Sequence, residues 1–370
     1  MESRVVILPG KVLFLNWMDT QNPNSGGSEL YAFELAKRLS QDRFEVTYLT
    51  SSFKGSEPNE KLNGVRIIRM GNMMSLYPRA LLWLKRHREE YDVIIEVING
   101  PPFLAKSSKL KAKHLAIIFH LPTFVATCKK LPLLGPFEFI ISRTLLRFFY
   151  RNVPIITDGE SSKSELVSLH FSNVFVNEDG LEPTNADSPE IKKEDLAVIT
   201  GPLKPWKKIE HGILAFSALP ENWRLVIIGK GNKKYLRYLM RIINKKNLHE
   251  RVKLLGYLSN IEKEKIYAWS KINIVTSEKE GFSLTAIEAA RYGSVCVGYN
   301  NYGIRDAVVN ERTGLLVSNN NIDGLKEAIL RLAKDDKLFA EMSKNCIEFS
   351  NEFTWDNTYL RFMKILERLK

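Results

Sequence analysis

The sequence predicts two α/β domains, each built on a doubly wound parallel sheet, and three observations support this fold class. The chain has 370 residues, which is more than one hydrophobic core usually organises. Short runs rich in valine and isoleucine alternate with longer helical patterns, as in successive βαβ units. A polar stretch at 182–195, with two prolines and few apolar residues, divides this alternation into two halves.

The first half contains the strand and helix candidates of one doubly wound sheet. Several strand candidates are apolar on both faces, which is typical of buried parallel strands. The strand candidates are 12–17, 45–50, 65–70, 92–97, 115–120, 154–158 and 174–177. The helix candidates are 28–40, 78–90, 136–151 and 161–170.

The second half repeats the pattern and completes the domain assignment. Its strand candidates are 196–200, 224–228, 252–255, 272–276, 295–299 and 315–317. We therefore expect an N-terminal domain at 1–182, a linker at 183–195, a C-terminal domain at 196–350 and a terminal amphipathic helix at 351–370. Ligands of doubly wound sheets bind beyond the carboxyl ends of the strands, so chemistry is expected where the two domains face a cleft.

Composition and charge narrow the classes of partner and compartment. The 54 basic and 42 acidic residues give a net charge of +12, which favours nucleic acid, phosphorylated substrates or an acidic membrane surface. Three isolated cysteines, Cys128, Cys296 and Cys346, predict neither a disulfide scaffold nor a zinc site. No apolar run is long enough for a membrane span, and Lys11 interrupts the start of any secretory segment. A cytosolic location is expected.

The segment from Glu280 to Glu288 carries the densest chemical signal. It follows the strand candidate at 272–276, and Ser283 suits the N-cap of a helix at 284–292. Carboxylates are strong acceptors for hydroxyl groups, and the four amides of residues 281–284 are expected to point into the cleft, ready for phosphate or sugar oxygens. These features together suit a nucleotide sugar. A capped surface helix with two solvated acids is the alternative.

Two further loops at strand ends have the composition of phosphate-binding loops. Gly26 and Gly27 precede the first helix, and adjacent glycines let a backbone approach a phosphate closely. Lys204 and Lys207 follow the strand candidate at 196–200, where they can neutralise a diphosphate. A tight turn without a ligand and a solvated charge run are the respective alternatives. The segment Gly229-Lys-Gly231 lacks the third glycine of a dinucleotide fingerprint and is a weak signal.

Taken in this order, the segments resemble the retaining family-4 glycosyltransferases, which have the GT-B fold of two Rossmann-like domains facing a cleft. The resemblance covers nearly the whole chain. Its motifs are Asn16-Trp17 with Gly26-Gly-Ser-Glu29, Val97-Ile-Asn-Gly-Pro-Pro-Phe103, Gly201 with Lys207, Leu255-Gly-Tyr257, the Glu280 and Glu288 pair, and Gly303-Ile-Arg-Asp306 with Thr313-Gly-Leu-Leu-Val317.

The resemblance implies a role for each matching residue. Glu288 is similar to the glutamate that binds ribose hydroxyls, and Glu280 to the one that contacts the donor sugar. Lys207 is similar to the lysine that stabilises the leaving diphosphate, and His120 to a histidine that faces the reaction centre. The remaining implied donor-binding residues are Gly26, Gly27, Gly281, Phe282, Ser283 and Leu284.

The chain departs from the family pattern at two positions. The family usually has an arginine where this sequence has Pro202, and proline cannot hold a phosphate. Either Lys204 supplies the missing cation or the donor is held less strongly. A related subgroup more often has aspartate where this chain has Glu96, to which no function is assigned.

Basic residues in the first half suit an acidic membrane that carries a lipid-linked acceptor. Arg143, Arg147 and Arg151 recur every four residues among apolar ones, and Lys106, Lys109, Lys111 and Lys113 cluster nearby. Helices that pack on a parallel sheet are equally apolar, so a purely structural role is the alternative.

The combined prediction is a retaining glycosyltransferase that moves a hexose from a nucleotide-diphosphate sugar to a hydroxyl acceptor, either a glycan or a lipid-linked saccharide. The sequence has no Asp-x-Asp triplet, so neither a metal nor another cofactor is expected. The location is expected to be cytosolic, and the basic surface favours peripheral contact with the membrane. The alternatives are another GT-B nucleotide-sugar enzyme, such as an epimerase, and a non-catalytic basic binding protein. No RNA-recognition motif occurs, so a nucleic-acid partner is not expected.

Overall fold

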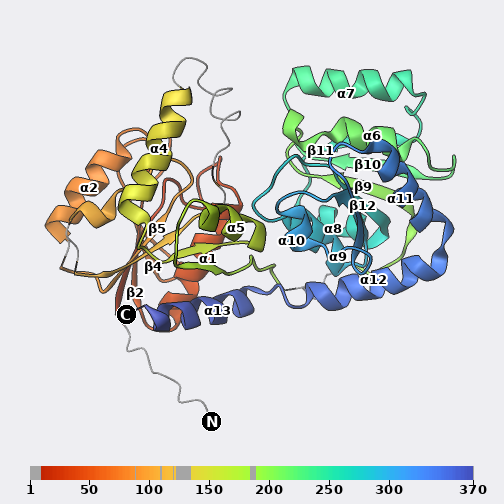
Figure 1. Ribbon diagram of the computed structural model, residues 1–370. Helices are drawn as coiled ribbons and strands as arrows, with labels where there is room; N and C mark the ends of the chain where they lie inside the picture. Colours follow the sequence, from red (N-terminus) through yellow and green to blue (C-terminus); the bar gives the residue numbers. More distant parts are fainter. Residues whose placement is uncertain are drawn as a thin grey trace, which may run out of the picture. The chain divides into compact units, whose positions relative to one another are not determined.

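The computed structural model describes residues 10–87, 89–108, 111–119, 121, 135–183 and 189–369, and for 108 and 135–142 it describes the main chain only. The chain forms two compact units (Figure 1). Unit 1 comprises Met1–Gly180 and Trp355–Lys370, and unit 2 comprises Leu181–Thr354. Within the described ranges, no helix is both long and apolar enough to cross a membrane.

Unit 1 is built on one sheet with the strand order β3-β4-β2-β1-β5-β6-β7-β8, in which every pair is parallel except β3 with β4. The strands are β1 Lys11–Leu15, β2 Glu45–Thr50, β3 Asn59–Leu62, β4 Val65–Arg69, β5 Val93–Val97, β6 Lys113–Ile117, β7 Ile155–Thr157 and β8 Val174–Val176. The helices are α1 Gly27–Gln41, α2 Leu76–His87, the 3-10 turn η1 Ala105–Ser108, α4 Gly135–Tyr150, α5 Glu160–Ser168 and α13 Trp355–Arg368.

Helices cover both faces of this sheet, which explains why its central parallel strands carry apolar residues on both faces. Along β1, Val12 and Phe14 pack in the core formed with α1 and α13, whereas Leu13 and Leu15 pack in the core formed with α2. Successive side chains of a strand point to opposite faces, so each strand must supply apolar residues to two cores. The predicted α/β class with a doubly wound parallel sheet is confirmed for this unit.

The antiparallel strand β3 was not predicted from the sequence. Leu62 pairs with Val65 across a two-residue turn formed by Asn63 and Gly64, whose φ angles are 50° and 86°. Asn-Gly with positive φ at both positions is the preferred sequence for a two-residue hairpin. Asn63-Gly64 therefore indicates the hairpin turn. The strand before it, β3, is mostly polar and partly exposed, so it has no apolar run that would indicate a strand.

Unit 2 is built on a six-stranded parallel sheet with the order β11-β10-β9-β12-β13-β14. Its strands are β9 Glu194–Thr200, β10 Arg224–Ile228, β11 Val252–Gly256, β12 Ser270–Val275, β13 Val295–Tyr299 and β14 Gly314–Val317. Its helices are the 3-10 turn η2 Pro205–Lys207, α6 Ile209–Phe216, α7 Lys233–Lys245, α8 Asn260–Trp269, α9 Leu284–Arg291, α10 Ile304–Ala307, α11 Ile322–Lys334 and α12 Asp336–Ser350.

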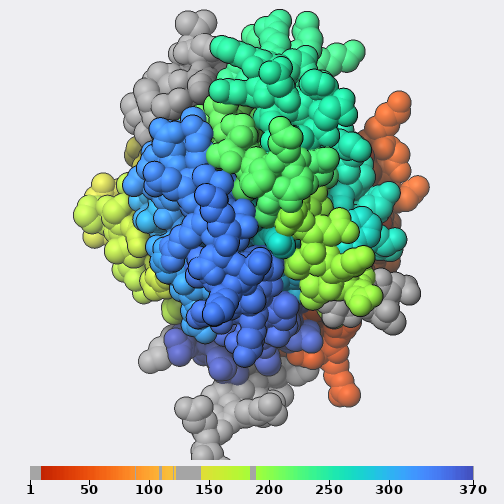
Figure 2. Space-filling model, turned by 90° about the vertical axis from the view of Figure 1, so that its right-hand side faces the viewer, coloured from red at the N-terminus to blue at the C-terminus, as the bar shows by residue number. Residues whose placement is uncertain are grey.

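Two helical layers bury the sheet of unit 2. The larger core combines α6, α7, α11 and α12 with one face of the strands, and the side chains of these helices form much of the surface seen in Figure 2. The opposite face is covered by α8, α9 and α10. Each of the six strands predicted in the second half is present, with ends that differ by at most two residues.

The strand order places a crevice at the same position in each sheet. In unit 1 the strand β1 lies between β2 and β5, and in unit 2 the strand β9 lies between β10 and β12. The chain turns to opposite sides of the sheet after β1 and β5 and after β9 and β12, and ligands of α/β sheets usually bind beyond the carboxyl ends of such strands. The crevice of unit 2 therefore lies beyond β9 and β12.

Helix α13 belongs to the core of unit 1 although it comes from the end of the chain. Phe362 of α13 is fully buried against α1 and the sheet, and Tyr359 donates a hydrogen bond to the Asp42 carboxylate over 2.6 Å. Arg38 of α1 also pairs with Asp356 at 3.0 Å. The apolar stripe predicted at the C-terminus is therefore a packing surface.

We expect Phe362→Ala to lower the free energy of unfolding of unit 1 by about 3–5 kcal/mol, since it leaves a cavity beneath α13. Calorimetry of the full chain should show the transition of unit 1 moving to lower temperature. The matched control is Leu360→Ala on the same helix, because that side chain is 57% exposed. Equal effects of the two substitutions would contradict the burial of this helix face.

Candidate functional site

The loops that follow β9 and β12 are joined by hydrogen bonds at the crevice of unit 2. The Thr276 hydroxyl lies 2.9 Å from the carbonyl oxygens of both Lys207 and Lys208. The Glu278 amide donates to the Trp206 carbonyl over 2.9 Å. Because β9 and β12 are neighbours in the sheet, these bonds fix Lys207 beside the loop that carries Glu280.

Lys207 and Glu280 form an ion pair at the centre of this arrangement. The Lys207 Nζ lies 2.8 Å from Glu280 Oε1, and the exposed fractions of the two side chains are 10% and 9%. The Ser277 hydroxyl donates to the same carboxylate oxygen. The ammonium group also lies 4.8 Å from the centre of the Trp206 ring. A shielded lysine and carboxylate attract each other more strongly than an exposed pair, so the structure holds the cation in one place.

The Glu280 loop is closed by the segment that begins α10. The Glu280 amide donates to the Tyr302 carbonyl over 3.1 Å, and the Ser283 amide donates to the Gly303 carbonyl over 3.0 Å. Gly303 has a φ of 78°, and a Cβ at this position would lie 2.7 Å from the carbonyl oxygens of Glu280 and Gly281. Gly303 must therefore be glycine for the loop to keep this conformation.

The start of α9 agrees only in part with the prediction of four available amides. Ser283 is the N-cap residue as predicted, but its amide is bonded to Gly303 and the Leu284 amide to the Phe282 carbonyl at 3.1 Å. This part of the prediction is wrong, because closing the loop consumes two donors. Among the described residues, the amides of Gly281 and Phe282 have no partner. The fully buried Ser283 hydroxyl likewise has none.

Glu288 lies in the second turn of α9 and is held by two groups of α8. Lys263 Nζ lies 2.8 Å from Glu288 Oε1, and the Tyr267 hydroxyl donates to Oε2 over 3.1 Å. Burial and the nearby Glu288 charge raise the pKa of Tyr267 well above its usual value, so the phenol remains a donor. A carboxylate accepts about four hydrogen bonds, and the Glu288 side chain is 26% exposed, so it can accept further donors from a ligand.

The glycines after β9 and β10 serve close packing of the backbone. A Cβ at Gly229 would lie 1.8 Å from the Gly201 carbonyl oxygen, and one at Gly231 would lie 2.8 Å from Leu203. The segment Gly229-Lys-Gly231 is thus explained without a ligand. Lys204 is exposed at the N-cap of η2, and its amide donates to the Pro202 carbonyl over 2.9 Å.

In unit 1 the predicted Gly26 and Gly27 lie at the start of α1 and are exposed. The Gly26 amide donates to Glu29 Oε2 over 2.7 Å, and the Trp17 indole donates to Glu29 Oε1 over 2.7 Å. Gly26 has a φ of −137°, and an added Cβ would meet only Glu29 Oε2 at 3.5 Å, an ordinary contact. The fold of unit 1 therefore does not require glycine at position 26.

The structure leaves one predicted residue untested and explains another. His120 lies outside the described residues, and β6 ends at Ile117, three residues earlier. Glu96, for which no role was predicted, is fully buried in β5. Its carboxylate accepts hydrogen bonds from the amides of Phe103 and Ala105 and from the Tyr150 hydroxyl. Glu96 thus fastens the loop after β5 to α4, and partners so distant in sequence could not be recognised from a single chain.

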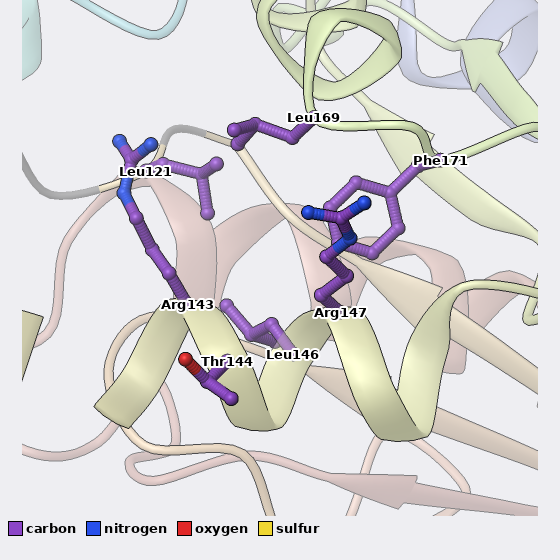
Figure 3. Close-up of a pocket in the computed structure, with 7 residues that line it drawn as sticks. All are labelled: Leu121, Arg143, Thr144, Leu146, Arg147, Leu169 and Phe171. Atoms are coloured by element: carbon purple, nitrogen blue, oxygen red, sulfur yellow. The ribbon is translucent and has the colours of Figure 1, made fainter. Parts of the chain in front are cut away.

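Unit 1 has a cavity of about 150 Å³ between α4 and the end of α5 (Figure 3). Its lining is mostly apolar, with Leu146, Arg143 and Arg147 coming from α4 and Phe171 from the segment after α5. Arg143 pairs with Glu165 at 3.7 Å, so the three arginines predicted as one basic row are not equivalent. Arg147 and Arg151 are exposed.

Comparison with known families matches both halves of the chain. The model for Glycosyltransferase Family 4 matches residues 25–176, and the model for Glycosyl transferases group 1 matches residues 182–349. The chain belongs to these glycosyltransferases. The second match includes the Lys207, Glu280 and Glu288 positions, and the first includes Gly26 and Gly27.

Individual relatives and solved structures agree with this family. A segment of 182 residues is 31% identical to the poly(glycerol-phosphate) alpha-glucosyltransferase of Bacillus subtilis, covering 48% of this chain and 26% of that protein. A segment of 251 residues is 25% identical to the N-acetylgalactosamine-N,N'-diacetylbacillosaminyl-diphospho-undecaprenol 4-alpha-N-acetylgalactosaminyltransferase of Campylobacter jejuni, covering 65% of this chain and 67% of that protein. The chain spans half or less of the length of three curated relatives. The matched shares are 48% of the uncharacterized glycosyltransferase MJ1178 of Methanocaldococcus jannaschii, 26% of the Bacillus enzyme and 16% of the exopolysaccharide phosphotransferase SCO2592 of Streptomyces coelicolor.

The structural comparison confirms the predicted GT-B fold. Anabaena Alr3699/HepE, solved in complex with UDP-glucose, superposes with a TM-score of 0.75 at 17% identity. The superposition covers 97% of this chain and 100% of the HepE chain. Sucrose-phosphate synthase of Thermosynechococcus elongatus superposes with a TM-score of 0.78 at 17% identity, covering 97% of this chain and 98% of that chain.

We expect Gly303→Ala to open the Glu280 loop, because the new methyl group collides with two carbonyl oxygens. Hydrogen exchange of the Glu280 and Ser283 amides should become about tenfold faster, because the free energy of local opening of the loop falls by about 1.4 kcal/mol. Gly55→Ala is the control, since Gly55 has a φ of 85° but no atom within 4 Å of the added Cβ. Unchanged protection of both amides in Gly303→Ala would contradict the close packing.

Proposed function

We propose that this chain is a retaining glycosyltransferase that moves a hexose from a nucleotide-diphosphate sugar to a hydroxyl acceptor. The observation that carries the proposal is the convergence of Lys207, Glu280 and the start of α9 at the crevice of unit 2, with Glu288 one turn further along the helix. This set combines a cation for phosphate with carboxylates for hydroxyl groups, and a nucleotide sugar presents both. The UDP-glucose complex of the similarly folded HepE supports the same class of donor.

Glu288 is proposed to bind the ribose hydroxyls of the nucleotide. Lys263 and Tyr267 each occupy one oxygen of its carboxylate and fix its orientation. The remaining lone pairs can then accept two neighbouring hydroxyl groups in one defined geometry. The same support keeps the carboxylate in place when no donor is bound, so little conformational entropy is lost on binding.

Lys207 is proposed to stabilise the diphosphate as it departs. The leaving group develops the largest negative charge of the reaction, and a positioned cation lowers the energy of that state. Glu280 neutralises this cation, so binding of the donor must loosen the 2.8 Å contact or share the ammonium group between carboxylate and phosphate. Released from that contact, Glu280 can accept hydrogen bonds from the sugar hydroxyls.

The amides of Gly281 and Phe282 and the Ser283 hydroxyl are proposed to complete the donor site. These donors have no partner among the described residues, and they lie where α9 begins. A helix N-terminus favours anionic and strongly polar oxygens. Since the sequence has no Asp-x-Asp triplet, we propose that these groups and Lys207 do the work without a metal ion.

Gly26 and Gly27 are proposed to approach the phosphates of the donor. The fold does not require glycine at position 26, so a role in ligand binding is the simplest reason for a bare backbone there. The Gly26 amide is bonded to Glu29, but the Gly27 amide lies at the start of a fifteen-residue helix, a position that favours an anion.

The proposed function is tested by incubating the chain with nucleotide sugars and a lipid-linked saccharide acceptor. We expect transfer with retention at the anomeric carbon, read by NMR of the product. Lys207→Ala should lower kcat by about 10²–10³, and Lys204→Ala by about tenfold if this lysine replaces the arginine absent at Pro202. Glu288→Ala should weaken nucleotide binding by about 1.5–3 kcal/mol.

The matched control is Lys326→Ala, which removes a lysine paired with Asp323 on the surface of α11. Normal turnover by Lys207→Ala at saturating donor would overturn the assignment of this lysine. Inversion at the anomeric carbon would exclude the retaining reaction. Isomerisation of the donor without an acceptor would instead identify an epimerase.

We also propose that unit 1 contacts an anionic membrane surface that presents the acceptor. Residues 101–151 include nine basic residues and one acidic residue. On α4 the exposed Arg147 is followed by Phe148, whose side chain is 78% exposed. A cation beside an exposed aromatic ring suits the interface of an anionic bilayer. The undecaprenol-linked substrate named for the Campylobacter relative supports a lipid-linked acceptor.

We expect the chain to co-sediment with vesicles that contain anionic lipid at low salt, and to dissociate at high salt because screening shortens the reach of the charges. Arg147→Gln with Arg151→Gln should weaken binding about thirtyfold, at about 1 kcal/mol for each of the two cations lost at the surface. The control removes two exposed lysines of unit 2, Lys245→Gln with Lys246→Gln. Equal binding to neutral vesicles would contradict the electrostatic contact.

A further inference from the structure

A buried ionic network holds the loop between β1 and α1. Its centre is Arg69, the last residue of β4, whose side chain is fully buried. The Arg69 Nε donates to Asp19 Oδ2 over 2.7 Å, and one terminal nitrogen donates to Gln21 Oε1 over 2.9 Å. The other terminal nitrogen donates to the Glu60 carboxylate over 2.6 Å and to the Glu57 carbonyl over 2.9 Å.

Asp19 passes this restraint to the loop backbone. Its second carboxylate oxygen accepts the Gln21 amide over 2.8 Å, and its carbonyl accepts the Asn22 amide over 3.2 Å. The Gln21 side chain also donates to Glu60 over 2.8 Å. The guanidinium therefore fixes both the side chains and the main chain of the loop at this point.

The hydrogen bonds continue from Asn22 to the start of α1. The Asn22 side chain accepts the Asn24 amide over 3.0 Å, and the Asn22 carbonyl accepts the Ser25 amide over 2.9 Å. The next amide, that of Gly26, is bonded to Glu29. Hydrogen bonds thus connect β4 with Ser25, and the next residue, Gly26, is held by Glu29.

Stability alone does not explain the choice of a buried arginine. Burying charged groups costs several kcal/mol of desolvation, and apolar residues of similar volume often stabilise a core as well or better. Arginine instead offers five donors in a rigid planar fork, which holds several partners in one geometry. Here that fork is used to connect a strand to one loop.

We propose that Arg69 is a positioning residue for glycosyl transfer, acting through this loop to hold the Gly26 and Gly27 backbone in the conformation that binds the donor phosphates. The proposal rests on the proposed function. Arg69 itself contacts neither glycine and is separated from solvent, so its effect is exerted through Asp19, Asn22 and Ser25.

The test compares Arg69→Lys and Gln21→Ala with the wild-type chain. Lysine keeps the charge but cannot bond Asp19, Gln21 and Glu60 together, and Gln21 is exposed, so its removal should leave the fold intact. Glu34→Gln is the control, because Glu34 is a buried carboxylate of α1 with two cationic partners, Lys37 and Arg38, away from the loop.

The first readout is hydrogen exchange and does not depend on catalysis. We expect the Asn22, Ser25 and Gly26 amides to exchange about tenfold faster in Arg69→Lys and in Gln21→Ala, and to be unchanged in Glu34→Gln. Unchanged exchange in both loop variants would overturn the proposal, whatever the activity of the wild-type chain.

The second readout separates positioning from stability. With a donor that the wild-type chain uses, both variants should lower kcat about tenfold while the Kd for the nucleotide stays within about twofold, since Glu288 and Lys207 are untouched. Faster exchange with normal kcat would overturn the positioning role. A wild-type chain that transfers no sugar would instead refute the proposed function.

Discussion

The ion pair between Lys207 and Glu280 organises the candidate site of unit 2. It joins the loops beyond two neighbouring strands, and the hydroxyls of Thr276 and Ser277 hold its two ends. The pair holds the Lys207 ammonium group against the loop that leads into α9. It also sets a condition for catalysis, because a diphosphate must be a better partner for the ammonium group than the carboxylate that already holds it.

The two units solve the same structural problem with different chemistry. In each, a hydrogen bond connects the segments that follow two neighbouring parallel strands. In unit 2 the Thr276 hydroxyl, after β12, donates to the Lys207 carbonyl, after β9. In unit 1 the Asn99 side-chain amide, after β5, donates over 2.9 Å to the hydroxyl of Ser28, in the first turn of α1 after β1. In each, a buried carboxylate completes the junction, Glu280 in one and Glu29 in the other. Loops that bind ligands are otherwise the least stable part of an α/β domain, and these bonds preorganise them.

Local patterns in the sequence predicted most elements and the central residues of the site. Apolar runs identified every parallel strand, and the spacing of Glu280 and Glu288 predicted one acid before α9 and one within it. The hairpin at Asn63 and Gly64 was missed because β3 has no apolar pattern. The loss of the Ser283 amide to Gly303, and the roles of Glu96 and Arg69, depend on partners between 7 and 54 residues away. Such contacts arise from the topology of the sheet, which a single sequence does not specify at that detail.

The position of α13 has a consequence for the order in which the chain acquires its structure. The core of unit 1 contains Phe362 and Trp355 together with residues of β1 and α1, so it joins segments from both ends of the chain. Unit 2 is formed by the continuous segment Leu181–Thr354. During synthesis, the second unit to be translated therefore has all its residues before the first one does. The apolar face of α1 that packs against α13 therefore stays uncovered until all of unit 2 and then α13 have been synthesised.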